Sequence, residues 1–386
     1  MSNEIFLFAG EKSGDLLGKQ LLKSLKKHLP DHSFVGVGGT EMRSEGIDCW
    51  MRMEEFQVMG FTDVILALPK IIKQFYALRK RILNTNPEAV ILIDYPGFNL
   101  RMAQALRKKG YQGKIVQYIS PTVWAWGKAR IQKMIQSLDL LLCIYPFEES
   151  FWEKHPLSAQ YVGNPIKETV QTHKYQNNWR KTFGIPDSEN LIALFPGSRQ
   201  REVQRHLPLQ LEAAEKLKAQ YPDAKFVISC AHKEIIPVME KMLDHNSLNL
   251  HQDIFLLPKD FSYELMRDSR TAIAKSGTVT LELALHKRPT AVMYHVAGLN
   301  YFIAKYLLKL NLPYYCIVNI LREKEVFPEM IEKGLSVPNI VRNVTKLHEE
   351  SPERYACIED CSKLISFLSE TDASNTAAKA IAKLLS

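Results

Sequence analysis

The sequence predicts an α/β protein made of two doubly wound, Rossmann-like domains that face a cleft, followed by a helical C-terminal tail. First, short apolar runs alternate with helical patterns along most of the 386 residues, which is typical of parallel sheets covered on both faces. Second, these runs form two series, separated by Gly163-Asn-Pro165 and a polar stretch that ends near residue 190. Third, the length suits two or three domains.

Each apolar run predicts a strand, and the segments between the runs predict helices. The first series predicts strands at 5–9, 34–38, 89–93, 114–119 and 138–144, with helices that include 16–29 and 99–109. The second series predicts strands at 191–195, 225–230, 254–257, 271–274 and 289–294, with helices that include 202–220 and 279–285. Residues from about 343 are polar and helical, without strands. We therefore expect domains at 1–165 and 166–342, and a tail over 343–386 that packs on the first domain or on a partner chain.

The composition is that of a globular protein, with 46% apolar and 24% charged residues. This excludes a disordered or collagen-like chain. The sequence has no apolar run of about 18 residues that would predict a membrane span, and no clear signal peptide, so we expect a cytosolic protein. The six cysteines form no CxxC pair, and we expect reduced, mainly buried thiols.

The net charge of +8 is concentrated in the first half, where residues 64–87 and 95–138 contain no acidic residue. Such patches attract phosphate groups. In the segment 59–83 basic and apolar residues are interleaved, which predicts either an interfacial membrane helix or a core helix with a basic outer face. On the first interpretation, the membrane contacts are Ile71, Lys73, Phe75, Arg79 and Arg81.

Ligands of doubly wound sheets bind at the C-terminal ends of strands, so loops that follow strands carry the candidate residues. In the first loop, Glu11, Ser13 and Asp15 belong to a strand–helix turn. One interpretation is that these residues contact a substrate. The other is that Ser13 or Asp15 caps the helix that follows. Asp94 ends an apolar strand, where a carboxylate is a natural general base. The alternative is that Asp94 caps the next helix, unless Asn99 is that cap.

Two tryptophans, Trp124 and Trp126, lie in the loop Ser120-Pro-Thr-Val-Trp-Ala-Trp126 after the fourth strand of the first series. They stack on a sugar ring, contact acyl chains, or fill the core.

The second series has two comparable loops. Gly197 and Ser198 offer backbone N–H groups, and Arg199 offers a guanidinium for phosphate. Ser276, Gly277 and Thr278 open a helix whose N-terminal end suits a diphosphate. Glu282 lies one turn deeper on the same face and suits the ribose hydroxyls of a nucleotide. Each loop alone is compatible with ordinary capping, but together they favour a nucleoside-diphosphate site.

Several other chemistries lack their motifs. The sequence contains no HExxH, no DxD pair and no GxSxG element. We therefore expect no metal and no cofactor.

The motifs resemble those of the lipid A disaccharide synthase family of glycosyltransferases. The matching stretches follow the family's order from residue 9 to about residue 330, and they are Ala9-Gly-Glu-Lys-Ser-Gly-Asp15, Val58-Met-Gly60, Asp94-Tyr-Pro-Gly-Phe-Asn99, Ser120-Pro-Thr-Val-Trp-Ala-Trp126, Pro146-Phe-Glu148, Pro196-Gly-Ser-Arg199 with Glu202, and Ser276-Gly-Thr-Val-Thr-Leu-Glu282. The chain departs from the family pattern at Asn164, Lys275, Val318 and Glu332. At the position of Lys275, the family usually has a small residue.

The resemblance implies a glycosyltransferase B fold, with the acceptor on the N-terminal domain and a UDP-sugar on the C-terminal domain. It implies transfer of 2,3-diacylglucosamine from UDP-2,3-diacylglucosamine to 2,3-diacylglucosamine 1-phosphate (lipid X), at the cytoplasmic surface of the inner membrane. Asp94 matches the candidate base. The expected acceptor-binding residues are Glu11, Ser13, Asp15, Asn99, Trp124 and Trp126. The donor-binding positions are Arg199, Ser276, Thr278, Glu282 and Asn319.

Three alternatives stay open. They are a muramyl-pathway N-acetylglucosaminyltransferase, a UDP-sugar epimerase, and a basic nucleic-acid-binding protein. The tryptophan loop argues against the first, and the basic amphipathic segment is unexplained by the second. The basic residues accompany no recognisable nucleic-acid motif, so we expect no nucleic-acid partner. The sequence leaves homo-oligomer formation open.

Overall fold

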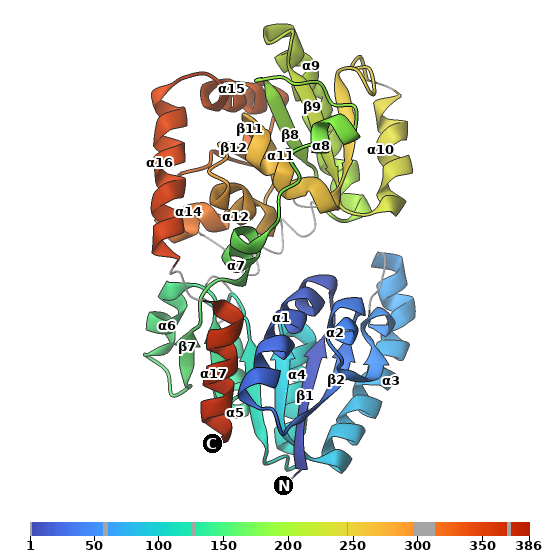
Figure 1. The fold of residues 1–386 in the computed structure, drawn as a ribbon, viewed down its shortest axis with the longest axis vertical. Helices are drawn as coiled ribbons and strands as arrows, with labels where there is room; N and C mark the ends of the chain where they lie inside the picture. Colours follow the sequence, from blue (N-terminus) through green and yellow to red (C-terminus); the bar gives the residue numbers. More distant parts are fainter. Residues whose placement is uncertain (1, 57–60, 125–128, 245, 296–312, 369–371) are drawn as a thin grey trace. The chain divides into compact units, whose positions relative to one another are not determined.

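The computed structural model describes residues 2–56, 61–124, 129–244, 246–295, 313–368 and 372–386. The chain forms two compact units, each with its own parallel sheet (Figure 1). The first unit comprises Met1–Glu168 and Leu368–Ser386, and the second comprises Thr169–Phe367.

The first sheet has the strand order β3-β2-β1-β4-β5-β6-β7. Its strands are β1 (Ser2–Ala9), β2 (Ser33–Gly38), β3 (Asp48–Arg52), β4 (Pro87–Ile93), β5 (Lys114–Tyr118), β6 (Leu140–Cys143) and β7 (Ala159–Tyr161). All pairings are parallel, and Phe8 of β1 lies between Val37 of β2 and Leu92 of β4.

Both faces of this sheet are buried, because alternate residues of one strand join different cores. Phe6 and Phe8 pack with α3 (Phe61–Thr85), α4 (Pro96–Lys108) and α5 (Ala129–Ser137). Ile5 and Leu7 pack with α1 (Lys12–His28) and α17 (Ala373–Leu385). Shorter helices of this unit are α2 (Thr40–Ser44) and α6 (Pro146–Trp152), and α7 (Pro165–Thr172) contains the boundary between the two units.

The second sheet has the strand order β10-β9-β8-β11-β12-β13, again parallel. Its strands are β8 (Leu191–Phe195), β9 (Lys225–Cys230), β10 (Ile254–Pro258), β11 (Thr271–Lys275), β12 (Thr290–Tyr294) and β13 (Glu329–Ile331). Its helices are α8 (Trp179–Thr182), α9 (Gln200–Gln220), α10 (Ile236–Leu243), α11 (Ser262–Asp268), α12 (Thr278–Leu285), α14 (Ile317–Arg322), α15 (Val337–His348) and α16 (Pro352–Phe367). One core joins the sheet to α9, α10 and α15.

The expected α/β class, with two parallel sheets and a helical C-terminal tail, is confirmed. All ten expected strands are present, and the sequence prediction missed β3, β7 and β13. These three are edge strands of three to five residues, and most of their side chains are partly exposed. Because an edge strand is only partly covered, it lacks the continuous apolar run that identifies a central strand.

The last helix, α17, packs against α1 of the first unit (Figure 1). Ala377, Ala378 and Ile381 join the core that contains Leu21 and Leu25. The two helices before it, α15 and α16, belong to the second unit. The structural units therefore divide at Glu168 and again at Leu368, where the sequence led us to expect boundaries at 165 and 342.

No helix in the described part of the chain combines the length and the hydrophobicity needed to cross a bilayer. All six cysteines are free and five are buried, which confirms the expectation from the sequence.

Candidate active site

The strand order of the first sheet reverses between β1 and β4, and the loops that follow these two strands meet there. Ligands of doubly wound sheets bind at such a switch point. The hydroxyl of Ser13, in the first turn of α1 after β1, donates to Oδ2 of Asp94, on the loop after β4, at 3.4 Å. Gly10 allows this approach, because a Cβ there would lie 2.8 Å from the Tyr95 ring.

Asp94 lies in a strained backbone that neighbouring amides hold in place. Asp94 and Tyr95 both have positive φ angles, 49° and 41°, and left-handed conformations of non-glycine residues persist only where surrounding contacts enforce them. The side-chain amides of Asn99 and Gln117 donate to the Asp94 carbonyl oxygen, at 2.6 and 3.0 Å. The cap residue of α4 is Tyr95, so Asp94 is not a helix cap.

Burial raises the pKa of the Asp94 carboxyl above its usual value, although hydrogen bonds from the Tyr95 amide and the Ser13 hydroxyl oppose the shift. A carboxylate with a raised pKa holds a proton more strongly than an ordinary aspartate, which suits a general base.

Asn99 and Asp15 have structural roles in place of the expected acceptor contacts. Asn99 is fully buried, and its amide also donates to the Ile93 carbonyl oxygen. Asp15 is 3% exposed. Its carboxylate accepts from the backbone N–H groups of Gly39, Glu41 and Met42, at 2.7, 2.9 and 3.1 Å. Asp15 therefore caps α2, where an anion is favoured, and does not cap its own helix.

Glu11 and Ser13 are exposed, and Glu11 is the cap residue of α1. Trp124 is half-buried, and its indole N–H donates to Oε1 of Glu148 at 3.2 Å. Trp126 and the Val58-Met-Gly60 motif lie outside the described residues.

Glu148 is not among the site residues expected from the sequence. Glu148 is fully buried, and its Oε2 accepts from the backbone N–H groups of Ile144 and Tyr145. Burial raises its pKa to about 7, against these hydrogen bonds and that of Trp124. The sequence did contain a signal for Glu148. It is a glutamate two residues after Pro146, at the start of a helix that follows a strand.

The second sheet has its own switch point, between β8 and β11. Here Glu202, in the first turn of α9, accepts from the backbone N–H groups of Ser198 and Arg199 at 3.1 and 3.4 Å. These amides are therefore not free for phosphate. This differs from the expectation that the Ser198 N–H group binds a phosphate. The exposed Arg199 side chain remains available. Gly197 has φ 124°, and a Cβ there would lie 2.7 Å from the Glu202 Cβ.

The N-terminal end of α12 is open to solvent. Gly277 and Thr278 are exposed, and no side chain in the described part of the chain caps this helix. The Ser276 N–H donates to the Met293 carbonyl oxygen at 2.9 Å, which fixes the loop to β12. Of the two helix ends at this switch point, the end of α12 is therefore the one that offers its dipole and N–H groups to an anion.

Glu282 lies one turn into α12 and is half-buried. The Tyr263 hydroxyl donates to its Oε1 at 3.0 Å, and burial raises its pKa against this hydrogen bond. His286 donates from Nδ1 to the Glu282 carbonyl oxygen and accepts at Nε2 from the Tyr175 hydroxyl, both bonds measuring 2.7–2.8 Å.

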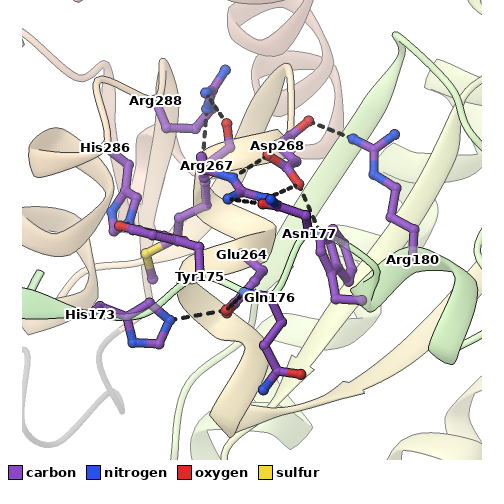
Figure 2. Close-up of polar contacts among 12 residues, drawn as sticks. His173, Tyr175, Gln176, Asn177, Arg180, Glu264, Arg267, Asp268, His286 and Arg288 are labelled. Carbon is purple, nitrogen blue, oxygen red and sulfur yellow. Dashed lines mark hydrogen bonds and ion pairs between the residues drawn. The ribbon is translucent and has the colours of Figure 1, made fainter.

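A polar network around α11 holds the chain segment that follows α7 (Figure 2). His173 and the Gln176 N–H both contact Oε1 of Glu264 at 3.0 Å, while Trp179 donates to Asp268 at 2.7 Å. These contacts fix the segment to α11 and thereby support the helix that carries Glu282.

Asn319, expected at the nucleotide, has a structural role. It is fully buried, its amide donates to the Phe327 carbonyl oxygen and to Glu329, and its oxygen accepts from the N–H groups of Val326 and Phe327. All its polar atoms are engaged in shaping the turn before β13.

The described side chains of α3 divide between core and surface. Phe75 packs on Phe98 with ring centroids 5.3 Å apart, and the Arg81 guanidinium lies 4.3 Å from the centre of the Trp50 ring. Ile71 and Arg79 are half-buried. The exposed side carries Lys73 with Ile72 and Tyr76, which are 46% and 53% exposed.

Within the described ranges, no group of three or more His, Cys, Asp or Glu side chains is arranged to hold a metal ion.

Two solved structures share the fold at low sequence identity. The UDP-GlcNAc 2-epimerase from Neisseria meningitidis, bound to UDP-GlcNAc, has a TM-score of 0.65 at 12% identity, over 99% of each chain. MurG from Acinetobacter baumannii has a TM-score of 0.55 at 14% identity, over 99% of this chain and 100% of that chain.

Curated relatives are closer in sequence. The lipid-A-disaccharide synthase of Chlamydia trachomatis serovar D is 40% identical over 86% of this chain, and this chain spans only 54% of that protein. The chain thus covers about half the length of its Chlamydia relatives. The lipid-A-disaccharide synthase of Azotobacter vinelandii is 34% identical over 98% of this chain and 97% of that protein. The family described as lipid-A-disaccharide synthetase matches residues 5–384, and the chain belongs to this family.

Proposed function

We propose that the protein is an inverting glycosyltransferase that transfers 2,3-diacylglucosamine from UDP-2,3-diacylglucosamine to the 6-hydroxyl of lipid X. The products are UDP and a β-1,6-linked disaccharide 1-phosphate. Membership of the family over residues 5–384 carries this proposal. The half-buried carboxylate of Asp94 at the switch point of the first sheet supports it.

In the proposed reaction, Asp94 takes the proton from the acceptor 6-hydroxyl as that oxygen attacks the anomeric carbon. The bond between this carbon and the diphosphate oxygen breaks, and the electron pair leaves with UDP. A single displacement inverts the anomeric centre. The contacts of Asn99 and Gln117 to the Asp94 backbone support the role of a base, because they fix the carboxylate before the substrate binds.

The donor residues in this proposal are Ser276, Gly277 and Thr278 for the diphosphate, Arg199 for a phosphate oxygen, and Glu282 for the ribose hydroxyls. The open end of α12 supports this assignment, since fixed N–H groups and a helix dipole stabilise charge that develops on the leaving group. The hydrogen bond from Tyr263 supports the role of Glu282, because it orients the carboxylate.

On the acceptor side, we assign Glu11 and Ser13 to the sugar of lipid X and Trp124 to its sugar or acyl chains. The exposure of Glu11 and Ser13, the hydrogen bond from Ser13 to Asp94 and the partial exposure of Trp124 support this assignment. We further propose peripheral contact with the cytoplasmic surface of the inner membrane through Ile71, Lys73 and Arg79 of α3, supplemented by Ile72 and Tyr76. Phe75 and Arg81 are less suited, because both contact other parts of the fold.

The test is a reaction of the purified protein with UDP-2,3-diacylglucosamine and lipid X in detergent, with a chelator present. We expect equimolar UDP and disaccharide 1-phosphate by mass spectrometry. UDP release without disaccharide, or an epimerised UDP-sugar, would overturn the proposal. Turnover that is lost with chelator and restored by a divalent cation would contradict the expectation that no metal is needed.

A further inference from the structure

Lys275 is a charged residue at the C-terminal end of β11, directly before the loop that opens α12. Its ammonium lies 3.2 Å from Oε1 of Glu202, and the two side chains are only 18% and 22% exposed. The pair joins the end of β11 to the first turn of α9, the helix that follows β8, so it links the two strands of this switch point. In the sequence, Lys275 stands out only as a departure from the family pattern.

The surroundings of Lys275 hold its ammonium in one place. The ammonium also lies 5.4 Å from the centre of the Tyr294 ring, a distance at which a cation is attracted to the ring face. The second oxygen of Glu202 accepts from the Ser198 amide. Burial alone would raise the pKa of Glu202, but the Lys275 charge and the amides outweigh it and hold the pKa below its usual range. The Glu202 carboxylate therefore holds the Lys275 side chain in place.

This fixed ammonium lies beside the open end of α12. A Cβ built on Gly277 would be 3.7 Å from the Lys275 Nζ. A lysine ammonium has three N–H donors, and among the described residues Glu202 is the hydrogen-bond acceptor that it contacts. Donors therefore remain for an oxygen atom that lies above Gly277.

We propose that Lys275 is a further donor-site residue, whose ammonium hydrogen-bonds the terminal phosphate of the UDP group. This inference rests on the proposed function. With the ribose at Glu282, the diphosphate runs toward the N-terminal end of α12, so its second phosphate reaches the Lys275 side of the loop. When the bond from the anomeric carbon to this phosphate breaks, the electron pair remains on the phosphate oxygen, and the ammonium stabilises that charge.

The experiment compares the affinities of UDP and UMP by calorimetry for the wild type and Lys275→Met. Because a charge-assisted hydrogen bond is lost, UDP affinity should fall roughly tenfold or more, while UMP affinity changes less than about threefold. Lys275→Arg should restore most of the UDP affinity. The matched control is Lys218→Met, since Lys218 forms a comparably exposed ion pair with Asp253 near the other end of α9 and should leave both affinities unchanged.

A second variant separates phosphate contact from a purely structural ion pair. Glu202→Gln also breaks the pair but keeps the ammonium, so it should retain or increase UDP affinity. Equal losses in Lys275→Met and Glu202→Gln, or equal losses of UDP and UMP in Lys275→Met, would overturn the inference. If the wild type binds neither nucleotide, the proposed function itself fails. If the wild type binds UDP and Lys275→Met binds it equally well, only this inference fails.

Discussion

Replacing Asp15 by alanine should destabilise the first unit, even though the sequence suggested a substrate contact for this residue. The carboxylate is buried and accepts from three backbone N–H groups at the start of α2. Alanine cannot accept these bonds, so three backbone N–H groups lose their side-chain acceptor. The loop after β2 then loses the anchor that ties it to α1.

The size of the effect follows from these three contacts. A hydrogen bond to a charged group contributes about 1.5–3 kcal/mol, and a buried N–H without a partner costs about 1–3 kcal/mol. Because the three bonds share one carboxylate, their contributions are not additive, and we expect a loss of about 3–5 kcal/mol in the free energy of unfolding. For a unit of this size that is a fall in melting temperature of roughly 6–20 °C.

Two measurements check this prediction. Thermal melts give the global effect, and hydrogen exchange of a peptide covering α2 should be slow in the wild type and fast in Asp15→Ala. Asp48→Ala is the matched control, because Asp48 is an exposed aspartate of the same unit. If Asp15→Ala keeps its melting temperature and its slow exchange but loses affinity for lipid X, the reasoning is refuted and Asp15 is an acceptor contact.

Three further predictions concern the candidate site. The pKa of Asp94 in the folded protein is raised above its ordinary value of 3.8, so ionised Asp94 lowers the free energy of unfolding above both pKa values and has no effect below the pKa of the unfolded chain. Asp94→Asn should therefore have a higher melting temperature than the wild type at neutral pH, and this difference should shrink as the pH falls toward 3.8. Identical melting temperatures at neutral pH would contradict this prediction. The pKa of Glu148 is about 7, so the indole N–H signal of Trp124 in a ¹⁵N-tryptophan NMR spectrum should titrate with that midpoint; a signal that stays constant through this pH would show that the contact is absent. Tyr263→Phe removes the hydroxyl that holds Glu282 and should weaken UDP binding by calorimetry about 3- to 10-fold; unchanged binding would separate Glu282 from the nucleotide.

The central strands could be predicted from the sequence because both faces of each sheet are buried. Runs such as 89–93 and 191–195 are apolar at every position, and each is a strand in the structure. The edge strand β3 was missed, because its residues are exposed or half-exposed. Such a strand is defined by its backbone pairing with β2, which the side-chain pattern does not show.

Some features of the candidate site could likewise be predicted from the sequence, and others could not. Asp94 could be proposed from the sequence because its signal is local: a carboxylate directly after a buried strand. The roles of Asp15 and Asn319 were not predictable, because their partners are backbone N–H and carbonyl groups of other loops. The contact between Lys275 and Glu202 joins residues 73 positions apart. Only the parallel order of β8 and β11 brings that pair together.

The central claim is that Asp94 is the base in transfer to the lipid X hydroxyl. The most direct test is single-turnover kinetics of Asp94→Asn with both lipid substrates, alongside equilibrium binding of UDP and lipid X. Loss of a general base should slow the chemical step about 100- to 10,000-fold, with both affinities unchanged. Turnover of Asp94→Asn within about threefold of the wild type would contradict the account.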